Sequence, residues 1–204
     1  KNGLRCSTAV GYLNPVKKRK NLKIITKAHV KNIEFKNNKA VAVNYWVKNI
    51  LKKSSADIEI ILSAGSIGSP HILQASGVGP LNLLKKHNIN IVKDSPFVGK
   101  NLHDHLMLRP VYKVKNIYTL NKLYHSYFEK MVAGLNFIFF RRGPLTMGAS
   151  QLCGFTKSDG NLATPNLQYH VAPMSTDKLG GAALHNFPAF TPTVTNIRPT
   201  SRGH

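Results

Sequence analysis

Two short arms rich in apolar residues lie near the start of the chain. The arms, residues 30–36 and 39–47, flank Asn37-Asn38, a pair that tolerates positive φ and therefore favours a hairpin turn. In the second arm one predicted face carries Val41, Val43, Tyr45 and Val47, and the other carries Ala40, Ala42, Asn44 and Trp46. The pattern predicts an antiparallel hairpin.

Further strands are expected on either side of this hairpin. The apolar content of residues 22–26 predicts a strand before it, and the polar residues 48–56 predict a loop after it. The run Ile58–Leu62 then suits a strand buried on both faces, which ends where small side chains begin at Ser63. The four strands together would form a meander that leads into a core strand.

A helix is expected directly after this core strand. Gly65 breaks the strand, Ser66 or Ser69 can cap the helix, and Pro70 fits just inside its start. Gly77 can close the helix in a left-handed conformation. A small-residue turn before a helix points backbone N–H groups at one spot, which suits a nucleotide, although many such turns bind nothing.

A second helix is predicted in the later part of the chain. Its apolar residues at helical spacing are Phe128, Met131, Val132, Leu135, Ile138 and Phe139. Arg141 and Arg142 favour the negative end of a helix dipole, and Gly143 can take the position after the helix. An aromatic-rich stripe of this kind is typical of a core, so we expect it to be buried.

The net charge of the chain changes the predicted fold and function little. The chain has 204 residues, 42% of them hydrophobic, and a formal net charge of +21. Its lysines are scattered and often stand beside asparagines, which a compositional bias explains without function. The cluster at residues 17–20 fits an exposed turn. A charge-driven nucleic-acid-binding module remains an alternative, but no specific nucleic-acid partner is expected. No apolar run is long enough for a membrane span.

Cysteine and histidine residues suggest no metal site. Cys6 and Cys153 stand among small or apolar neighbours, which favours buried free thiols, although they could pair. His103 and His105 have metal-ligand spacing on a strand, but strand geometry would send Asp104 to the opposite face. We therefore expect no metal.

Four segments resemble one known family. Residues 63–70, Ser-Ala-Gly-Ser-Ile-Gly-Ser-Pro, with the following Ser-Gly-Val-Gly-Pro, resemble the second signature of the glucose-methanol-choline (GMC) oxidoreductases, which depend on FAD. Residues 98–105 resemble the family's Val-Gly-x-Asn-Leu-x-Asp-His segment. Residues 142–146 and 198–203 are similar to its Gly-Pro-Leu-Thr and Arg-Pro-x-Ser-Arg-Gly turns. The resemblance spans essentially the whole chain and includes insect glucose dehydrogenase-like members.

The resemblance implies an α+β fragment of a two-domain FAD-dependent enzyme. Residues 1–105 would be part of the FAD-binding domain with its β-meander, and residues 106–204 the first half of an antiparallel-sheet substrate-binding domain. The substrate would be an alcohol, sugar or choline-like molecule whose CH–OH group gives a hydride to the flavin. The cofactor-binding residues carried over are Val30, Ala64, Gly65 and Ser66. Asn101, Asp104 and His105 would form a hydrogen-bonded latch.

Two parts of the family's machinery are not found in the sequence. No Gly-x-Gly-x-x-Gly follows a strand, and the family's catalytic histidine lies beyond the Pro-x-Ser-Arg-Gly turn, so no catalytic residue is assigned. We expect a fragment that is inactive alone. A non-catalytic relative or a pseudogene product is the alternative. The electron acceptor, oligomeric state and compartment stay open, and the resemblance to insect members allows secretion.

Overall fold

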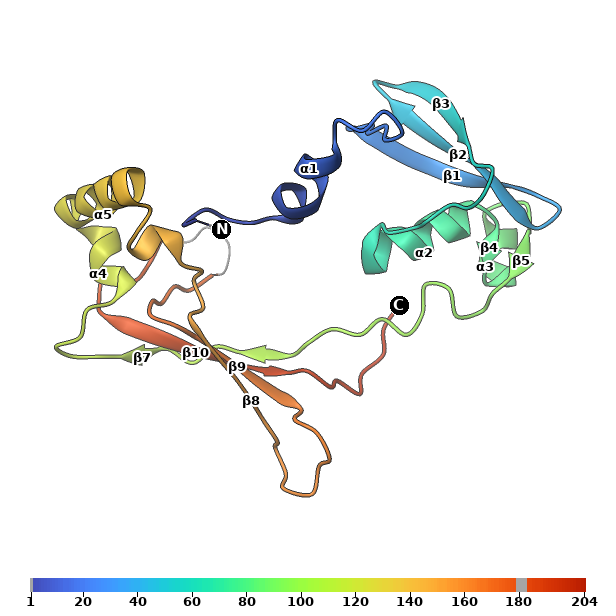
Figure 1. Cartoon of the computed structure of the whole chain (residues 1–204). Coiled ribbons are helices and arrows are strands. Elements are labelled where there is room, and N and C mark those ends of the chain that lie inside the picture. Colours follow the sequence, from blue (N-terminus) through green and yellow to red (C-terminus); the bar gives the residue numbers. More distant parts are fainter. Residues whose placement is uncertain (1, 179–182) are drawn as a thin grey trace. The chain divides into compact units, whose positions relative to one another are not determined.

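The computed structural model describes residues 2–178 and 183–204, and the chain divides into two units. The meander unit comprises residues 19–103 and 200–204, and the helix-pair unit comprises residues 1–18 and 104–199. Figure 1 shows their elements. The assignment of residues 1–105 and 106–204 to two functional domains stays a prediction.

The meander unit is built on an antiparallel sheet of three strands. They are β1 (Ala28–Lys36), β2 (Lys39–Val47) and β3 (Ile50–Ser55), paired in the order β1-β2-β3. The predicted hairpin is confirmed, because Asn37 and Asn38 join β1 to β2 with φ of 50° and 62°. The predicted loop at 48–56 is wrong. Lys48 and Asn49 also take positive φ, so they turn the chain into β3.

One helix packs against this sheet, and shorter elements follow it (Figure 1). Helix α2 (Gly65–Ala75) is joined to β1 by Ser76, whose Oγ accepts from the backbone N–H of Ile33 at 2.7 Å. Gly77 has φ of 88°, as predicted. The elements that follow are β4 (Val78–Gly79), α3 (Leu81–Lys86) and β5 (Lys93–Asp94), with β4 and β5 parallel. Leu84 of α3 is completely buried, which anchors this part to the unit.

Two predicted strands of this unit do not form. Residues 22–26 and 58–62 carry no strand in the described part of the chain, and Ile58 is 88% exposed. A strand needs a neighbour to satisfy its backbone N–H and C=O groups, and no described strand pairs with either segment. The apolar residues of these two segments predicted buried strands, but no described strand pairs with either segment.

The helix-pair unit combines a mixed-length antiparallel sheet with two helices. Its strands are β6 (Met107–Leu108), β7 (Tyr112–Lys113), β8 (Leu152–Thr156), β9 (Leu167–Ala172) and β10 (Ala189–Asn196). The order is β6-β10-β9-β8, and β7 also pairs with β10. The sequence also predicts strands that begin at Cys153 and run over residues 165–171, and these predictions are confirmed by β8 and β9. The glycine- and proline-rich residues 179–192 predict a mobile loop; residues 179–182 lie outside the described residues, and 189–192 belong to β10.

This unit contains short helical turns near the N-terminus of the chain and further helices later in the sequence. These are a π-helical turn, η1 (Ala9–Leu13), and α1 (Asn14–Val16); the later ones are α4 (Leu120–His125), α5 (Tyr127–Phe140) and the 3₁₀ turn η2 (Pro144–Thr146). Ser126 Oγ accepts from the N–H of Glu129 at 3.2 Å and so caps α5. Arg141, with φ of 53°, ends α5 in the left-handed region, so the predicted role of Gly143 there is wrong.

The predicted burial of the α5 stripe is also wrong. Only Ala133 of α5 is buried, whereas the six stripe residues are exposed. Both cysteines, Cys6 and Cys153, are free and exposed rather than buried. The spacing of apolar residues thus predicted helix α5 correctly, but the burial expected for its apolar side was wrong.

A buried polar network ties α4 to the segment that precedes β10. Asn121 and Ser175 are each 1% exposed. Asn121 Nδ2 donates to the carbonyl oxygens of Ser175 (3.2 Å) and His185 (2.8 Å), and Asn121 Oδ1 accepts from the N–H of Ser175 at 2.9 Å. His185 contacts Ser175 Oγ through Nδ1 at 2.9 Å and Asp177 Oδ1 through Nε2 at 2.8 Å. A carboxylate only accepts, so Nε2 carries a proton toward Asp177.

Candidate functional site

The start of α2 is open. Gly65, the first residue of the helix, has φ of +80°, and no neighbouring atom lies within 4 Å of the place where a Cβ would stand. The N-cap residue Ala64 makes no side-chain capping bond. The first N–H groups of a helix have no intrahelical acceptor. They are therefore available to an anionic ligand.

The serines predicted to cap this helix do not cap it. Ser69 Oγ accepts from the N–H of Ala64 at 3.0 Å, one position before the helix begins. Pro70 stands inside the helix rather than in its first turn. The sequence predicted the helix start within a few residues. It placed the cap on the wrong group, because Gly65 starts the helix instead of separating it from the preceding segment.

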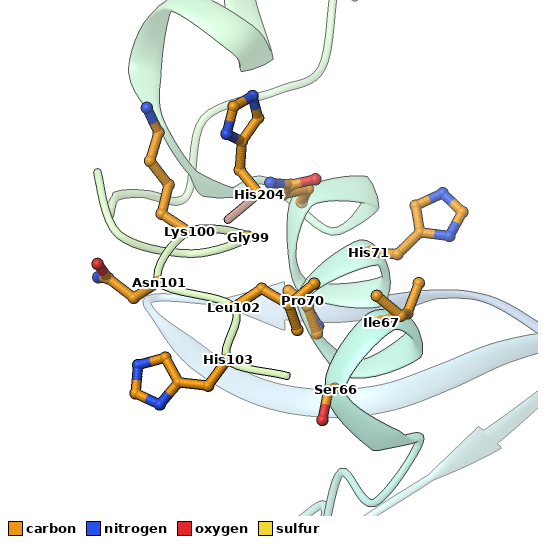
Figure 2. A pocket seen from close by; sticks show the side chains of 11 residues that line it. Ser66, Ile67, Pro70, His71, Gly99, Lys100, Asn101, Leu102, His103 and His204 are labelled. Carbon is orange, nitrogen blue, oxygen red and sulfur yellow. The ribbon is translucent and has the colours of Figure 1, made fainter. Parts of the chain in front are cut away.

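A hollow of about 620 Å³ lies along α2 within the meander unit (Figure 2). It is lined by Ser66, Ile67, Pro70, His71 and Gln74 of the helix, by residues 99–103, and by His204. In Figure 2, Leu102 lies next to Pro70, with Lys100 and His204 toward one end of the hollow and Ser66 and His103 toward the other. Its volume is typical of small-molecule sites.

Hydrogen bonds hold the second wall of this hollow in place. Gln74 Nε2 donates to the carbonyl oxygen of Val98 at 3.0 Å, which fixes the chain beside Gly99. Leu102 exchanges two backbone hydrogen bonds with Gly203, at 2.9 and 2.8 Å. The segment that carries Lys100 is therefore held at both ends by the same unit.

The lining of the hollow is basic and contains no carboxylate. Lys100 contributes a positive charge, and three imidazoles come from His71, His103 and His204. At its floor Ile67, Pro70 and Leu102 provide apolar surface. An apolar floor with basic edges beside an open helix N-terminus fits a ligand that joins a flat or aliphatic part to phosphate or another anion.

The four predicted cofactor-binding residues occupy two places in the meander unit. Ala64, Gly65 and Ser66 stand together at the start of α2, and Ser66 lines the hollow. Val30 lies on β1, opposite Tyr45 of β2, and does not line the hollow. Their roles stay predictions, as does the absence of a catalytic assignment.

The motif at residues 98–105 contributes differently from the expectation. Residues 99–103 line the hollow, whereas Asp104 Oδ1 accepts from the neighbouring N–H of His105 at 2.8 Å. No side-chain hydrogen bond of Asn101 is found in the described residues, and the latch of Asn101, Asp104 and His105 stays a prediction. Within the same part of the chain no group of three His, Cys, Asp or Glu side chains is close enough to hold a metal ion.

Sequence reasoning missed several lining residues. Gln74 and His71 were not singled out, although Ile67, Pro70, His71 and Gln74 recur at helical spacing and so share one side of α2. His204 reaches the hollow only because Gly203 pairs with Leu102 across a long sequence separation. Helical spacing signals the first group, but nothing local signals the second.

Comparison with known proteins gives a consistent result. The family model "GMC oxidoreductase" matches residues 1–107. The oxygen-dependent choline dehydrogenase of Pectobacterium atrosepticum is 38% identical over 203 residues, covering 98% of this chain and 36% of that protein. The alcohol dehydrogenase [acceptor] of Pseudomonas putida is 37% identical over 206 residues, covering 100% of this chain and 37% of that protein. The chain thus spans little more than a third of these relatives.

Solved structures agree on the fold. A formate oxidase variant from Aspergillus oryzae has a TM-score of 0.83 at 23% identity, covering 98% of this chain and 39% of that one. A fungal aryl-alcohol oxidase has a TM-score of 0.79 at 19% identity, covering 99% and 41%. At such identities the likeness concerns the fold. No helix in the described residues is long and apolar enough to cross a membrane.

Proposed function

The chain belongs to the GMC oxidoreductase family, whose members are FAD-dependent flavoproteins, and from this membership we propose the activity of the full-length protein. It is an FAD-dependent oxidoreductase that acts on the CH–OH group of a small alcohol, sugar or choline-like substrate. Residues 1–204 contribute part of the flavin-binding domain and part of the substrate-binding domain.

The observation that carries this proposal is the open start of α2 beside the basic hollow. Gly65 takes a conformation that L side chains rarely adopt, and it leaves the adjacent backbone uncovered. Gly65 and Ser66, which follow Ala64 at the helix start, would hold the anionic part of FAD through backbone N–H groups, with Lys100 adding a positive charge. Val30 would offer its backbone to the adenine. The residues present therefore fit the cofactor.

Flavin, when bound, accepts a hydride from the alcohol carbon. In this proposal the residues of this chain bind and orient the cofactor and the substrate, and none of them transfers a proton. The exposed imidazoles of His71, His103 and His204 are spread around the hollow, and we assign none of them a catalytic role. By the family resemblance, the histidine that removes the hydroxyl proton is not among the residues that match here.

The test is made on the full-length protein. After purification we expect the two-banded absorption spectrum of an oxidised flavin, release of FAD rather than FMN on acid denaturation, and bleaching of the spectrum when an alcohol, sugar or choline is added without an acceptor. Reduction of an artificial dye then measures turnover over a panel of these substrates.

Each rival function has its own outcome. A protein that holds FAD but is bleached by no substrate in the panel would be a non-catalytic relative. A protein that lacks flavin and binds RNA with a steep salt dependence would contradict the proposal and support a charge-driven nucleic-acid-binding module.

A further inference from the structure

The basic run, residues 17–20, is an exposed turn, as the sequence predicts. Residues 17–27 are all exposed and belong to no described helix or strand. In this part of the described chain, backbone hydrogen bonds run from the N–H of Lys17 to the carbonyl oxygen of Leu13 at 2.8 Å, and from the N–H of Leu22 to that of Arg19 at 3.1 Å. A segment with so few backbone bonds opens at little cost in free energy.

The charge of the basic run limits what can cover it in the full-length protein. All of its side chains are cations, and no Asp or Glu precedes Glu34 in the chain. Glu34 itself is engaged, because its Oε2 lies 2.7 Å from Lys53 Nζ. Taking adjacent cations out of water is strongly unfavourable unless carboxylates pair with them. Parts of the full-length protein outside residues 1–204 can cover exposed apolar side chains, but they cannot cover these cations without acidic groups of their own.

Three other pairs of adjacent basic residues occur in the sequence, and two of them lie inside a strand or a helix. Residues 52–53 belong to β3, which pairs with β2. Residues 85–86 belong to α3, next to the completely buried Leu84. A protease could reach the backbone of either pair only after that strand or helix had opened.

The third pair, residues 141–142, is held by the end of α5. The N–H groups of Arg141 and Arg142 donate to carbonyl oxygens in the last turns of the helix. A Cβ placed on Gly3 would meet the carbonyl oxygen of Arg141 at 2.7 Å, so the backbone there is also closely packed. In the described structure of the basic run, by contrast, no backbone bond of a helix or strand holds Arg19 or Lys20.

We propose that the basic run is a site of limited proteolysis by an endoprotease that recognises paired basic residues. A protease binds its substrate as an extended strand, so the segment must leave its native conformation, which exposed segments outside helices and strands do most readily. A carboxylate in the primary pocket of the protease then binds the Arg or Lys side chain before the cleaved bond. The charge of the run selects this class of protease, and its loosely held backbone selects it over the other three pairs.

Cleavage here is a hydrolysis that needs no reactant besides water. The peptide bond after Arg19 or after Lys20 breaks. The oxygen and one hydrogen of water complete the new carboxyl group, and the other hydrogen goes to the new amino group. In both cases the cut precedes β1, so every strand and helix described in the meander unit stays on one side of it.

Digestion of the full-length protein in native buffer tests the proposal. The probe is a calcium-dependent, subtilisin-like endoprotease that requires two adjacent basic residues, and mass spectrometry of the products locates each cut. We expect a new amino terminus at Lys20 or Asn21, formed at least about 100-fold faster than a cut at any of the other three pairs. Low concentrations of urea should leave this rate nearly unchanged and raise the other three, because those cuts require a strand or helix to open.

Lys18→Gln combined with Arg19→Gln tests the pairing itself, because it leaves no two adjacent basic residues in the run. We expect cleavage there to stop, whereas Lys18→Arg, which keeps the pairs, should be cut as the unaltered protein is. The matched control is Lys85→Gln combined with Lys86→Gln, which removes an exposed pair from α3 and should leave cleavage in the basic run unchanged. All the substituted side chains are exposed, so the variants should fold as the unaltered protein does.

Three results would overturn the proposal. One is the absence of any cut within the basic run in native buffer, which would show that acidic groups of the full-length protein cover it. Another is a cut at one of the other three pairs that comes first. The third is an equal rate of cleavage in the variant that combines Lys18→Gln with Arg19→Gln. The flavin spectrum is recorded separately, so failure here is distinct from failure of the proposed oxidoreductase function.

Discussion

Helices α2 and α5 are exposed at different places: α2 at its N-terminus, and α5 along its apolar side. The start of α2 lacks a side-chain cap and begins with a glycine at positive φ, while its side lines a hollow. The start of α5 is closed by Ser126, but its apolar side is exposed. An open helix end concentrates N–H groups at one point and suits a small anion, whereas an open helix side offers an extended surface.

The largest expected effect is at the open end of α2. Gly65→Val puts a β-branched residue at φ of +80°, which that residue cannot adopt without strain, so the start of α2 should rearrange and the full-length protein should lose its flavin. Absorbance of the purified protein measures flavin content. Gly143→Val is the matched control, because Gly143 has φ of +87° and equally open surroundings but lies after α5. Equal flavin loss in both variants would refute a specific role for Gly65.

The next largest effect concerns the closed end of α2. A Cβ at Gly77 would collide with the carbonyl oxygen of Asn90 and crowd Val92, and φ there is +88°. Gly77→Ala should lower the free energy of unfolding by more than about 2 kcal/mol, measured by urea denaturation. Gly134→Ala, inside α5 with open surroundings, should instead raise it by roughly 0.5 to 1 kcal/mol. Similar losses in both variants would mean that helix glycines here have no positional role.

The third prediction contrasts the two N-termini directly. Ser126→Ala removes the cap of α5 and should lower its local stability by about 1 kcal/mol, seen as a roughly fivefold loss of hydrogen-exchange protection in its first turns. Ser66→Ala in α2 should leave protection unchanged, because that helix has no side-chain cap. Loss of protection in α2 would show that Ser66 caps the helix after all.

The smallest effect is expected at Tyr118, beside α5. Partial burial and the hydrogen bond to Glu129 raise its pKa from 10.0 to about 12. The neutral phenol is favoured in the folded state, so the stabilisation is present below pH 10 and is lost as pH rises from about 10 to about 12. Tyr118 is 54% exposed, so solvent screening limits the contribution to less than about 1 kcal/mol.

Spectrophotometric titration of tyrosinate measures this shift. The tyrosine that titrates latest should disappear in Tyr118→Phe, and in Glu129→Gln it should titrate at lower pH. A titration curve that is identical in both variants and in the unaltered protein would contradict the assignment.

Local sequence signals predicted several elements that depend on neighbours in the chain. Asn37-Asn38 predicted its hairpin and Gly77 its helix end, and the apolar spacing in residues 128–139 predicted α5. The second hairpin was missed because Lys48-Asn49 is a weaker turn signal than Asn37-Asn38, and the strand after it is largely polar, with every residue exposed. Backbone propensity at a turn can outweigh the composition of the strand that follows.

Two further predictions failed because they depended on distant partners. The Ile58–Leu62 segment has strand composition, but no described strand lies beside it, and the stripe of α5 has core composition without a described cover. The same limit applies to the site. Of the predicted cofactor-binding residues only Ser66 lines the hollow, and the position of His204 there depends on the Leu102–Gly203 pairing, which no local pattern predicts.

In the buried network around Asn121, the side-chain nitrogen Nδ2 cannot be replaced by an oxygen. Both carbonyl oxygens that it contacts can only accept, so deamidation of Asn121 would set a carboxylate oxygen against the carbonyls of Ser175 and His185, inside a site shielded from water. Slow chemical ageing at this single position would therefore detach the segment before β10 from α4 while leaving every helix and strand intact.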